Sequence, residues 1–186
     1  MDPINVFQRA VDQTGRIVSG VEPDQHGAST PCSGWDVRAL LNHTIAGIQM
    51  FDAAARGCAF DGSMFEGDNV GNDPGASYES RAAKLRDALA QPGVIDGTWA
   101  MPFGTVPGAA AIGFATLEVA QHGWDVARAT GQQPDFDAEV TEAANAAARS
   151  APADLVRSPG VFGPEADCPS GAPAHDQLAA FVGRSV

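Results

Sequence analysis

The segment 109–130 limits the fold more than any other part of the sequence, because it is the clearest predicted helix of the chain. Its apolar residues recur at helical spacing, and Gly131 follows at the position where glycine commonly ends a helix. A helix of this length buries one face only against other elements. The rest of the chain must therefore supply partners that cover it.

Further helices are predicted on both sides of this segment. In the second of them we expect Ser33 to be the N-cap, with Asp36 three residues later. Pro92 and Gly93 end the third. The predicted helical ranges are 3–20, 35–56, 78–91, 137–149 and a last apolar turn or helix at 177–182. Four or five helices with little strand indicate an all-α helical bundle.

The segments between these helices carry little strand signal. Residues 58–77 are rich in glycine and acids, and we expect a long loop that either covers a cavity or lacks order. Residues 94–107 are predicted to be extended, at most a small hairpin, since Pro102 and Pro107 exclude a central strand. Neither a repeat nor a linker divides the chain, so we expect one domain over residues 1–186.

The charge of the chain excludes several classes of partner. The formal net charge is -12, from 23 acidic and 11 basic residues, and such a surface repels nucleic acid and anionic lipid. Apolar runs stay short of the roughly 20 residues that span a bilayer, and the N-terminus lacks a signal-peptide pattern. We therefore expect a cytoplasmic protein. Its three cysteines form no Cys-x-x-Cys pair, which argues against a disulfide framework or a thiolate zinc site.

Two helix faces carry the residue types that bind metals. Glu118 and His122 are four residues apart, so they lie one turn apart on one face of the predicted helix. His43 lies on an apolar face of an earlier helix, where Gly47 leaves space one turn away. If both faces point inward, two imidazoles and a carboxylate can bind a divalent metal with positions left open. The spacing alone is equally compatible with a simpler interpretation, in which these side chains form ordinary hydrogen bonds and bind no metal.

Several segments of the chain resemble those of a known metal-binding family, which favours the interpretation as a metal site. The stretch from Thr30 to His43, with Cys-Ser-Gly-Trp-Asp at 32–36, resembles the metal-binding domain of mycothiol-dependent maleylpyruvate isomerases, a member of the DinB/YfiT-like superfamily. Residues 118–131, the Pro-Phe-Gly-Thr-Val-Pro-Gly at 102–108, and the ending at 161–164 and 178–184 resemble the same family. Residue by residue, its metal triad falls on His43, Glu118 and His122.

This resemblance implies a DinB/YfiT-like four-helix bundle that binds zinc by default, with nickel, iron or manganese as alternatives. Relatives are thiol-dependent isomerases or S-transferases, so it also implies a low-molecular-weight thiol such as mycothiol and a small electrophile as partners. The isomerases carry a further C-terminal domain, whereas this chain ends near the bundle, so we do not expect maleylpyruvate isomerisation itself. The alternative is a non-catalytic bundle, in which the metal site is structural or a relic. A homodimer stays open.

Other residues have weaker claims to function. Cys32 precedes a helix whose dipole lowers thiol pKa values, yet a small loop residue is the simpler interpretation. Asp125 shares the face of His122, and it either orients that ring or bonds to Arg128 or backbone. Trp35 and Trp124 are expected in the core or at its rim. Four helical arginines could recognise a carboxylate, and the sequence does not choose among Arg38, Arg81, Arg86 and Arg128.

Overall fold

The computed structural model describes residues 2–152 and 162–186. Over these residues the chain forms α-helices, two short 3-10 helices and one hairpin. The elements, in chain order, are α1 (Pro3–Ser19), η1 (Pro23–Gln25), α2 (Val37–Ala55), η2 (Gly62–Phe65), α3 (Pro74–Leu89), β1 (Thr98–Met101), β2 (Gly104–Pro107), α4 (Gly108–Thr130), α5 (Ala138–Ser150) and α7 (Ala174–Phe181). The predicted all-α bundle with at most a small hairpin is confirmed.

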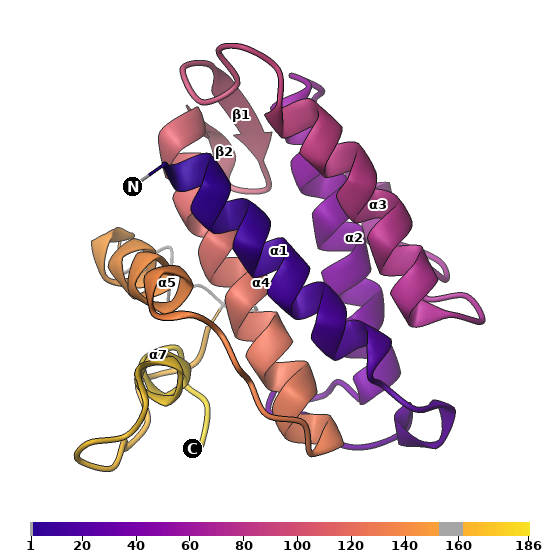
Figure 1. Cartoon of the computed structure of the whole chain (residues 1–186), viewed down its shortest axis with the longest axis vertical. Helices are drawn as coiled ribbons and strands as arrows, with labels where there is room; N and C mark the ends of the chain where they lie inside the picture. The colour runs from indigo at the N-terminus through magenta and orange to yellow at the C-terminus, as the bar shows by residue number, and fades with distance from the viewer. Residues whose placement is uncertain (1, 153–161) are drawn as a thin grey trace.

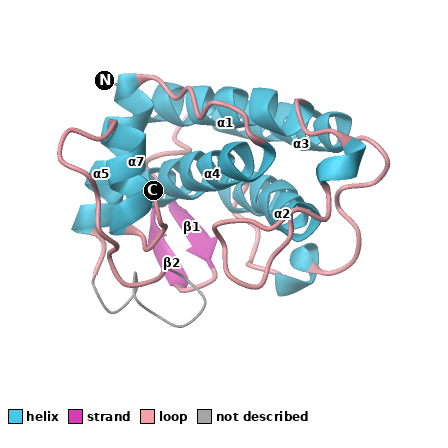
Figure 2. Cartoon of the chain, turned by 90° about the horizontal axis from the view of Figure 1, so that it is seen from below, coloured by secondary structure: helices cyan, strands magenta, loops and turns pink. Residues whose placement is uncertain are grey.

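Helices α1 to α4 form the bundle. Helix α1 packs on α3 and α4, and α2 packs on the same two helices from the other side. Seen from below, α1 and α3 form one layer and α4 and α2 the other (Figure 2). Helices α5 and α7 cover the outer side of α4 (Figure 1). Both helices that carry the predicted metal ligands, α2 and α4, are therefore neighbours.

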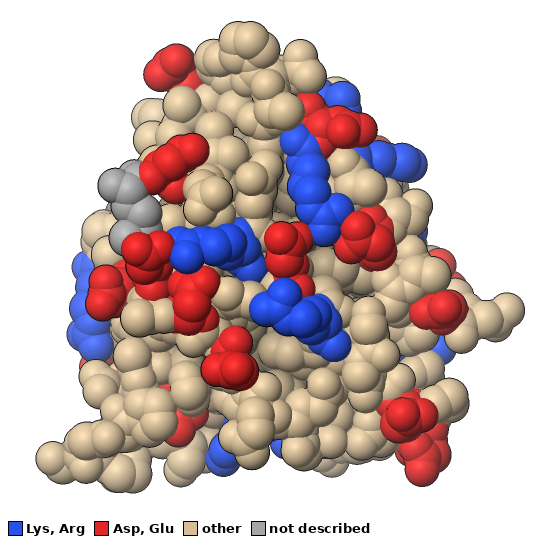
Figure 3. Space-filling model, in the orientation of Figure 1, with Lys and Arg blue, Asp and Glu red and all other residues tan. Residues whose placement is uncertain are grey.

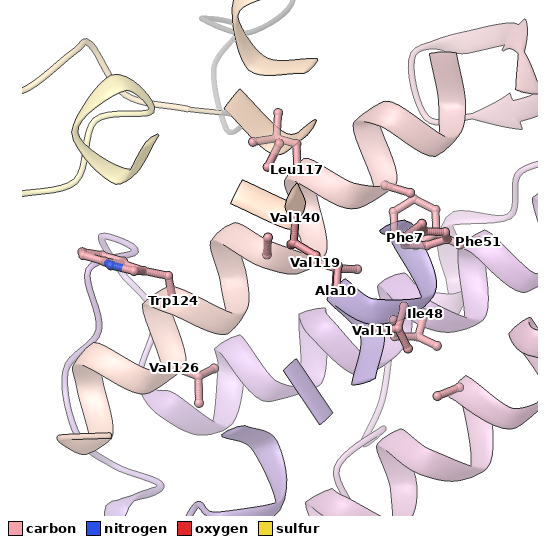
Figure 4. Close-up of a cluster of buried hydrophobic side chains, with 14 of the residues drawn as sticks. Phe7, Ala10, Val11, Ile48, Phe51, Leu117, Val119, Trp124, Val126 and Val140 are labelled. Atoms are coloured by element: carbon pink, nitrogen blue, oxygen red, sulfur yellow. The ribbon is translucent and has the colours of Figure 1, made fainter. Parts of the chain in front are cut away.

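The core explains why the long helices stay together. Phe7 of α1 and Phe51 of α2 meet edge to face with ring centroids 5.7 Å apart (Figure 4). The buried Tyr78 of α3 donates its hydroxyl to the Val11 carbonyl oxygen at 3.0 Å, which ties α3 to α1. Burial raises the pKa of this phenol well above its ordinary value. Tyr78 is therefore a neutral structural residue.

The hairpin closes one end of the bundle. Strands β1 and β2 are antiparallel, with Thr98 opposite Pro107 and Met101 opposite Gly104. Trp99 is buried, and its indole N–H donates to the Val94 carbonyl oxygen at 3.1 Å. The extended segment that the sequence predicted is therefore a two-stranded hairpin anchored by one tryptophan.

The expected N-cap of α2 at Ser33 is wrong. Asp36 caps the helix, because its side chain accepts a hydrogen bond from the Ala39 N–H at 2.8 Å, and the helix begins at Val37. The preceding residues form a turn in which the Thr30 hydroxyl donates to the Trp35 carbonyl oxygen at 2.9 Å. Trp35 consequently lies outside the helix.

Helix α3 begins earlier than the sequence analysis placed it. Asp73 caps it by accepting from the Ala76 N–H at 2.9 Å, and Pro74 occupies the first turn, where its missing N–H costs nothing. The sequence placed the start too late because Gly75 lies in the first turn, and glycine disfavours helices. A Cβ at Gly75 would come within 2.7 Å of the Ser19 hydroxyl, so close packing on α1 requires glycine here.

The other predicted segments need smaller adjustments. Helix α7 begins three residues before the predicted range, and the expected loop at 58–77 contains η2. The five prolines at 150–173 also predict a loop there. This range and the resembling stretch at 161–164 fall partly on residues outside the described part of the chain.

Two surface properties bear on partners. Among the described residues, no helix is long and apolar enough to cross a membrane. On the face drawn in Figure 3, the basic side chains lie beside acidic ones. Arg86 pairs with Asp12 and Glu79, for example, and Arg9 with Asp137.

A candidate metal centre between α2 and α4

The three predicted ligands come together. One oxygen of Glu118, Oε1, lies 3.0 Å from His43 Nε2 and 3.0 Å from His122 Nε2. Glu118 and His122 occupy successive turns of α4, and His43 reaches them from α2. The three ligand atoms all lie within 4.8 Å of one another, close enough to hold one metal ion. The faces of both helices therefore do point toward each other.

Glu118 and His122 carry opposite charges that stabilise each other. Burial alone would raise the pKa of the Glu118 carboxyl, but His122 and His43 hold it well below its ordinary value. Burial alone would lower the pKa of His122, but Glu118, Asp125 and Cys32 raise it well above its ordinary value. The carboxylate is thus ionised and His122 holds a proton that a metal would displace.

Asp125 orients His122, which decides a question that the sequence left open. His122 Nδ1 donates to Asp125 Oδ2 at 3.1 Å, which leaves Nε2 on the side of Glu118. Asp125 is fully buried and accepts hydrogen bonds from Gln121 and Arg184, whereas the Arg128 guanidinium lies over the Trp124 ring. A carboxylate on the far nitrogen of a histidine ligand is the usual partner of such ligands in metal sites.

Cys32 belongs to this buried cluster rather than to a solvent-facing loop. Its thiol donates to Asp125 Oδ2 at 3.1 Å, and its sulfur lies 3.9 Å from His122 Nδ1. Burial raises the pKa of the Cys32 thiol, which argues against the alternative of a thiol activated by the helix dipole. The cap at Asp36 separates Cys32 from the helix end. Cys32 is therefore a neutral hydrogen-bond donor in the metal-free protein.

Arg184 is a site residue that the sequence did not predict, although it lies in a stretch that carries the family resemblance. Its guanidinium donates from Nε to Asp125 Oδ1 and from a terminal nitrogen to Asp125 Oδ2, both at 3.0 Å. The same terminal nitrogen lies 3.2 Å from the Cys32 sulfur. Burial would lower the pKa of Arg184, but Asp125 raises it. A glycine directly before this arginine was the available signal, since it indicates a turn at the end of α7.

A pocket opens on the other side of the triad. It has a volume of about 710 Å³, and His43 is its one contribution from the triad. The Trp35 ring lies 4.7 Å from the His43 ring, and the Phe65 ring lies 5.2 Å from it on the long loop. The loop at 58–77 therefore does line a cavity. Trp35 packs against the rim of the core and also lines the pocket. Trp124 is buried in the core, points toward α7 and donates to Asp176 Oδ1 at 2.9 Å (Figure 4).

Among the four arginines considered, Arg38 alone lines this pocket. It donates to both carboxylate oxygens of Asp68 at 2.9 Å. Arg81 donates to the neutral acceptors Gln49 and Asn69, away from the triad. Arg86 is bound to surface acids. If any of the four contacts a ligand beside His43, the structure favours Arg38.

These residues fit a divalent metal by the chemistry of their donors. Two imidazole nitrogens and a carboxylate oxygen suit zinc and its neighbours in the first transition row. The hydrogen bond from His122 Nδ1 to Asp125 fixes the tautomer that leaves Nε2 free for a metal. Fold and site together define a helical-bundle protein with a three-ligand candidate metal centre at the edge of a pocket.

Comparison with known proteins gives the family. The model of the mycothiol maleylpyruvate isomerase N-terminal domain matches residues 7–127, and the chain belongs to this family. Two relatives are the uncharacterized proteins MT0763 and Rv0738 of Mycobacterium tuberculosis, strains CDC 1551 and H37Rv. Each is 37% identical over 187 residues, covering 100% of both chains.

Solved structures share the fold. Crystal structures of the mycothiol-dependent maleylpyruvate isomerase and of a histidine-to-alanine variant align with a TM-score of 0.53 at 16% identity. The alignment covers 76% of this chain and 65% of that enzyme. At this identity the likeness establishes the bundle and leaves the reaction to be argued from the site.

Proposed function

We propose that this chain is a single-domain, cytoplasmic, metal-dependent enzyme that adds a low-molecular-weight thiol to a small electrophile, as an S-transferase or isomerase-like protein. The observation that carries the proposal is the convergence of His43, Glu118 and His122, whose ligand atoms lie within 4.8 Å of one another beside an open pocket. Family membership supports a thiol of the mycothiol type as the co-substrate. Zinc is the proposed metal.

Each residue of the site has a defined task in this proposal. When bound, a divalent metal supplies a Lewis acid that lowers the pKa of a thiol near it. His43, Glu118 and His122 hold the metal, and Asp125 holds the proton on His122 Nδ1 so that Nε2 faces the site. The remaining residues provide the surroundings of the reactants.

The pocket orients the reactants. The Trp35 and Phe65 rings, with centroids 4.7 and 5.2 Å from that of His43, exclude water from one wall and offer apolar area to an electrophile. Arg38 and Asp68 form a polar rim that is able to bond to the polar part of a thiol or an electrophile. A mixed lining of this kind is typical of small-molecule sites.

The first test measures the metal. Protein purified without chelator is analysed for zinc, nickel, iron and manganese beside His43→Ala and His122→Ala, with His175→Ala as the control outside the site. We expect about one metal per chain in the wild type and in the control, and none in the two site variants. Metal-free wild-type protein that also fails to bind added zinc would overturn the proposal.

The second test measures turnover. A panel of electrophiles is offered with mycothiol or another low-molecular-weight thiol, using the metal-loaded protein and His43→Ala. Thiol loss reports an S-transferase, and conversion of the electrophile without thiol loss reports an isomerase, which releases the thiol again. Turnover by the wild type that disappears in the variant supports the enzyme. Stoichiometric metal without turnover across a broad panel would favour the alternative, a non-catalytic bundle with a structural metal.

A further inference from the structure

The end of the chain is folded back onto the candidate metal centre. After α7, Gly183 takes a φ of +91°, and the Arg184 N–H bonds to the Ala179 carbonyl oxygen at 2.8 Å. A Cβ on Gly183 would lie 2.7 Å from the backbone of Gly163, so a side chain does not fit there. The glycine turn therefore directs Arg184 into the protein, where its side chain is buried.

Arg184 holds both carboxylate oxygens of Asp125. Its Nε and a terminal nitrogen donate to Oδ1 and Oδ2 of Asp125, each at 3.0 Å, in the two-pronged arrangement that a planar guanidinium favours. The Gln121 side chain also donates to Oδ1, at 3.2 Å. Rotation of the Asp125 carboxylate would break these bonds, and its position is thereby fixed.

Because Asp125 is held in place, its hydrogen bond also fixes the orientation of the His122 ring. Oδ2, one of the two oxygens that Arg184 holds, also accepts from His122 Nδ1 at 3.1 Å. Carboxylates bonded to histidine ligands set the orientation of the ring and its affinity for metal. The three ligands lie within the residues 7–127 that the family model matches, whereas Arg184 lies outside that range.

We propose that Arg184 is a positioning residue of the metal centre: it holds Asp125 so that this carboxylate keeps His122 Nε2 facing Glu118. The C-terminal segment thus completes a site whose ligands come from α2 and α4. The identity of the bound ion rests on the proposed function, but the orientation of His122 does not, because the hydrogen bonds that set it are made between residues of the chain itself.

A purely structural role is the competing explanation, in which Arg184 only attaches the C-terminal segment to the bundle. Arg149 offers a matched control for it. Its guanidinium lies over the Phe181 ring at 4.4 Å and joins α5 to α7 without touching the site. Arg149→Met and Arg184→Met therefore both weaken the attachment of this segment, and only the second removes a bond to Asp125.

The first readout uses metal-free protein. The Nδ1 proton of His122 is expected as a protected downfield resonance in NMR spectra recorded with chelator, and His122→Gln assigns it. We expect Arg184→Met to lose this resonance through exchange with water, and Arg149→Met to keep it. Loss in both variants, or in neither, overturns the positioning role.

The second readout is the binding of Co²⁺, followed by its visible absorption. Arg184→Met should bind Co²⁺ roughly 10- to 100-fold more weakly than the wild type, with an altered spectrum, while Arg149→Met should match the wild type. Wild-type protein that binds no Co²⁺ but shows the NMR behaviour above would sink the metal function and leave the positioning of His122 standing. Unchanged affinity and spectrum in Arg184→Met would refute the inference.

A second variant covers the case in which Arg184→Met does not fold. Arg184→Lys keeps the charge and loses the two-pronged geometry. We expect a folded protein with Co²⁺ affinity between those of the wild type and the methionine variant, and a shifted spectrum. Affinity and absorption equal to the wild type would show that the guanidinium geometry positions nothing.

Discussion

The two nitrogens of His122 face very different regions of the molecule. On the Nδ1 side lies a buried cluster of Cys32, Asp125 and Arg184, in which Asp125 is 0% exposed and both of its carboxylate oxygens accept hydrogen bonds. On the Nε2 side lie Glu118 and then His43, whose side chain is 27% exposed and borders the pocket. One ring therefore separates a closed, charged interior from an open cavity.

This difference assigns separate tasks to the two regions. The closed cluster leaves little freedom, because a buried charge that loses its partner is costly. It is suited to fixing geometry. The pocket is lined by half-exposed aromatic rings and a solvent-exposed ion pair, which are able to adapt to a ligand. Substitutions in the first region should thus change stability and metal affinity, and those in the second should change ligand binding.

The largest expected effect is that of Asp125→Ala, which breaks the closed cluster. It leaves the buried Arg184 guanidinium without its carboxylate, and we expect a loss of ~3–5 kcal/mol in the free energy of unfolding. Urea unfolding of the metal-free protein measures it. Asp12→Ala is the control, since it removes a carboxylate from the exposed pair with Arg86 and should cost about 0–1 kcal/mol. Equal losses in the two variants would contradict the comparison.

The pH dependence of the metal-free protein tests the charge of the triad. The raised pKa of His122 gives stability that is complete below its ordinary value of 6.5 and is lost as the pH rises through the raised pKa. The lowered pKa of Glu118 gives stability that is present above its ordinary value of 4.5 and is lost as the pH falls through the lowered pKa. Greatest stability is thus expected between these two ordinary values.

Urea unfolding in chelator across the pH range measures this profile. His122→Gln should flatten the alkaline limb and leave the acid limb in place. Zinc affinity should change in the opposite direction and increase with pH, because the metal displaces the proton from His122 Nε2. Stability that rises through neutral pH in the metal-free wild type would refute the assigned charges.

In the open region, Phe65→Ala should affect ligands more than stability. The ring is half buried, so we expect a loss of about 1 kcal/mol in unfolding free energy, and a severalfold weaker binding of thiol or electrophile to the metal-loaded protein. Calorimetry measures the binding. Phe60→Ala removes another phenylalanine of the same loop that is exposed and does not line the pocket, and it should bind as the wild type does. Identical behaviour of the two variants would argue against a ligand beside His43.

The smallest expected effect on stability belongs to Asp68→Asn at the rim. Loss of this exposed carboxylate weakens the hold on one terminal nitrogen of Arg38 and makes its guanidinium available to a ligand, while the melting temperature should stay unchanged. We expect carboxylate-bearing electrophiles to gain severalfold in kcat/KM and neutral ones to stay the same. Glu66→Gln, a neighbouring acid outside the pocket lining, is the control for the change in net charge. A gain for neutral substrates would sink the role given to Arg38.

The sequence alone predicted most of the helices and the three candidate metal ligands. Helical spacing predicted α1, α2, α4 and α5 to within a few residues, because their apolar stripes and end residues act locally. The four-residue step from Glu118 to His122 placed both on one face for the same reason. Errors arose where local signals competed, as at the caps Asp36 and Asp73.

Only the tertiary structure decided what surrounds the triad. The carboxylate of Asp125 meets a guanidinium 59 residues further along the chain and a thiol 93 residues before it, and periodicity carries no information about contacts at such separations. The placement of Trp35 and Phe65 over His43 likewise depends on a turn and a loop that fold against α2. Helix geometry is local and can be calculated from sequence, whereas the closed and open sides of His122 arise from packing between distant segments.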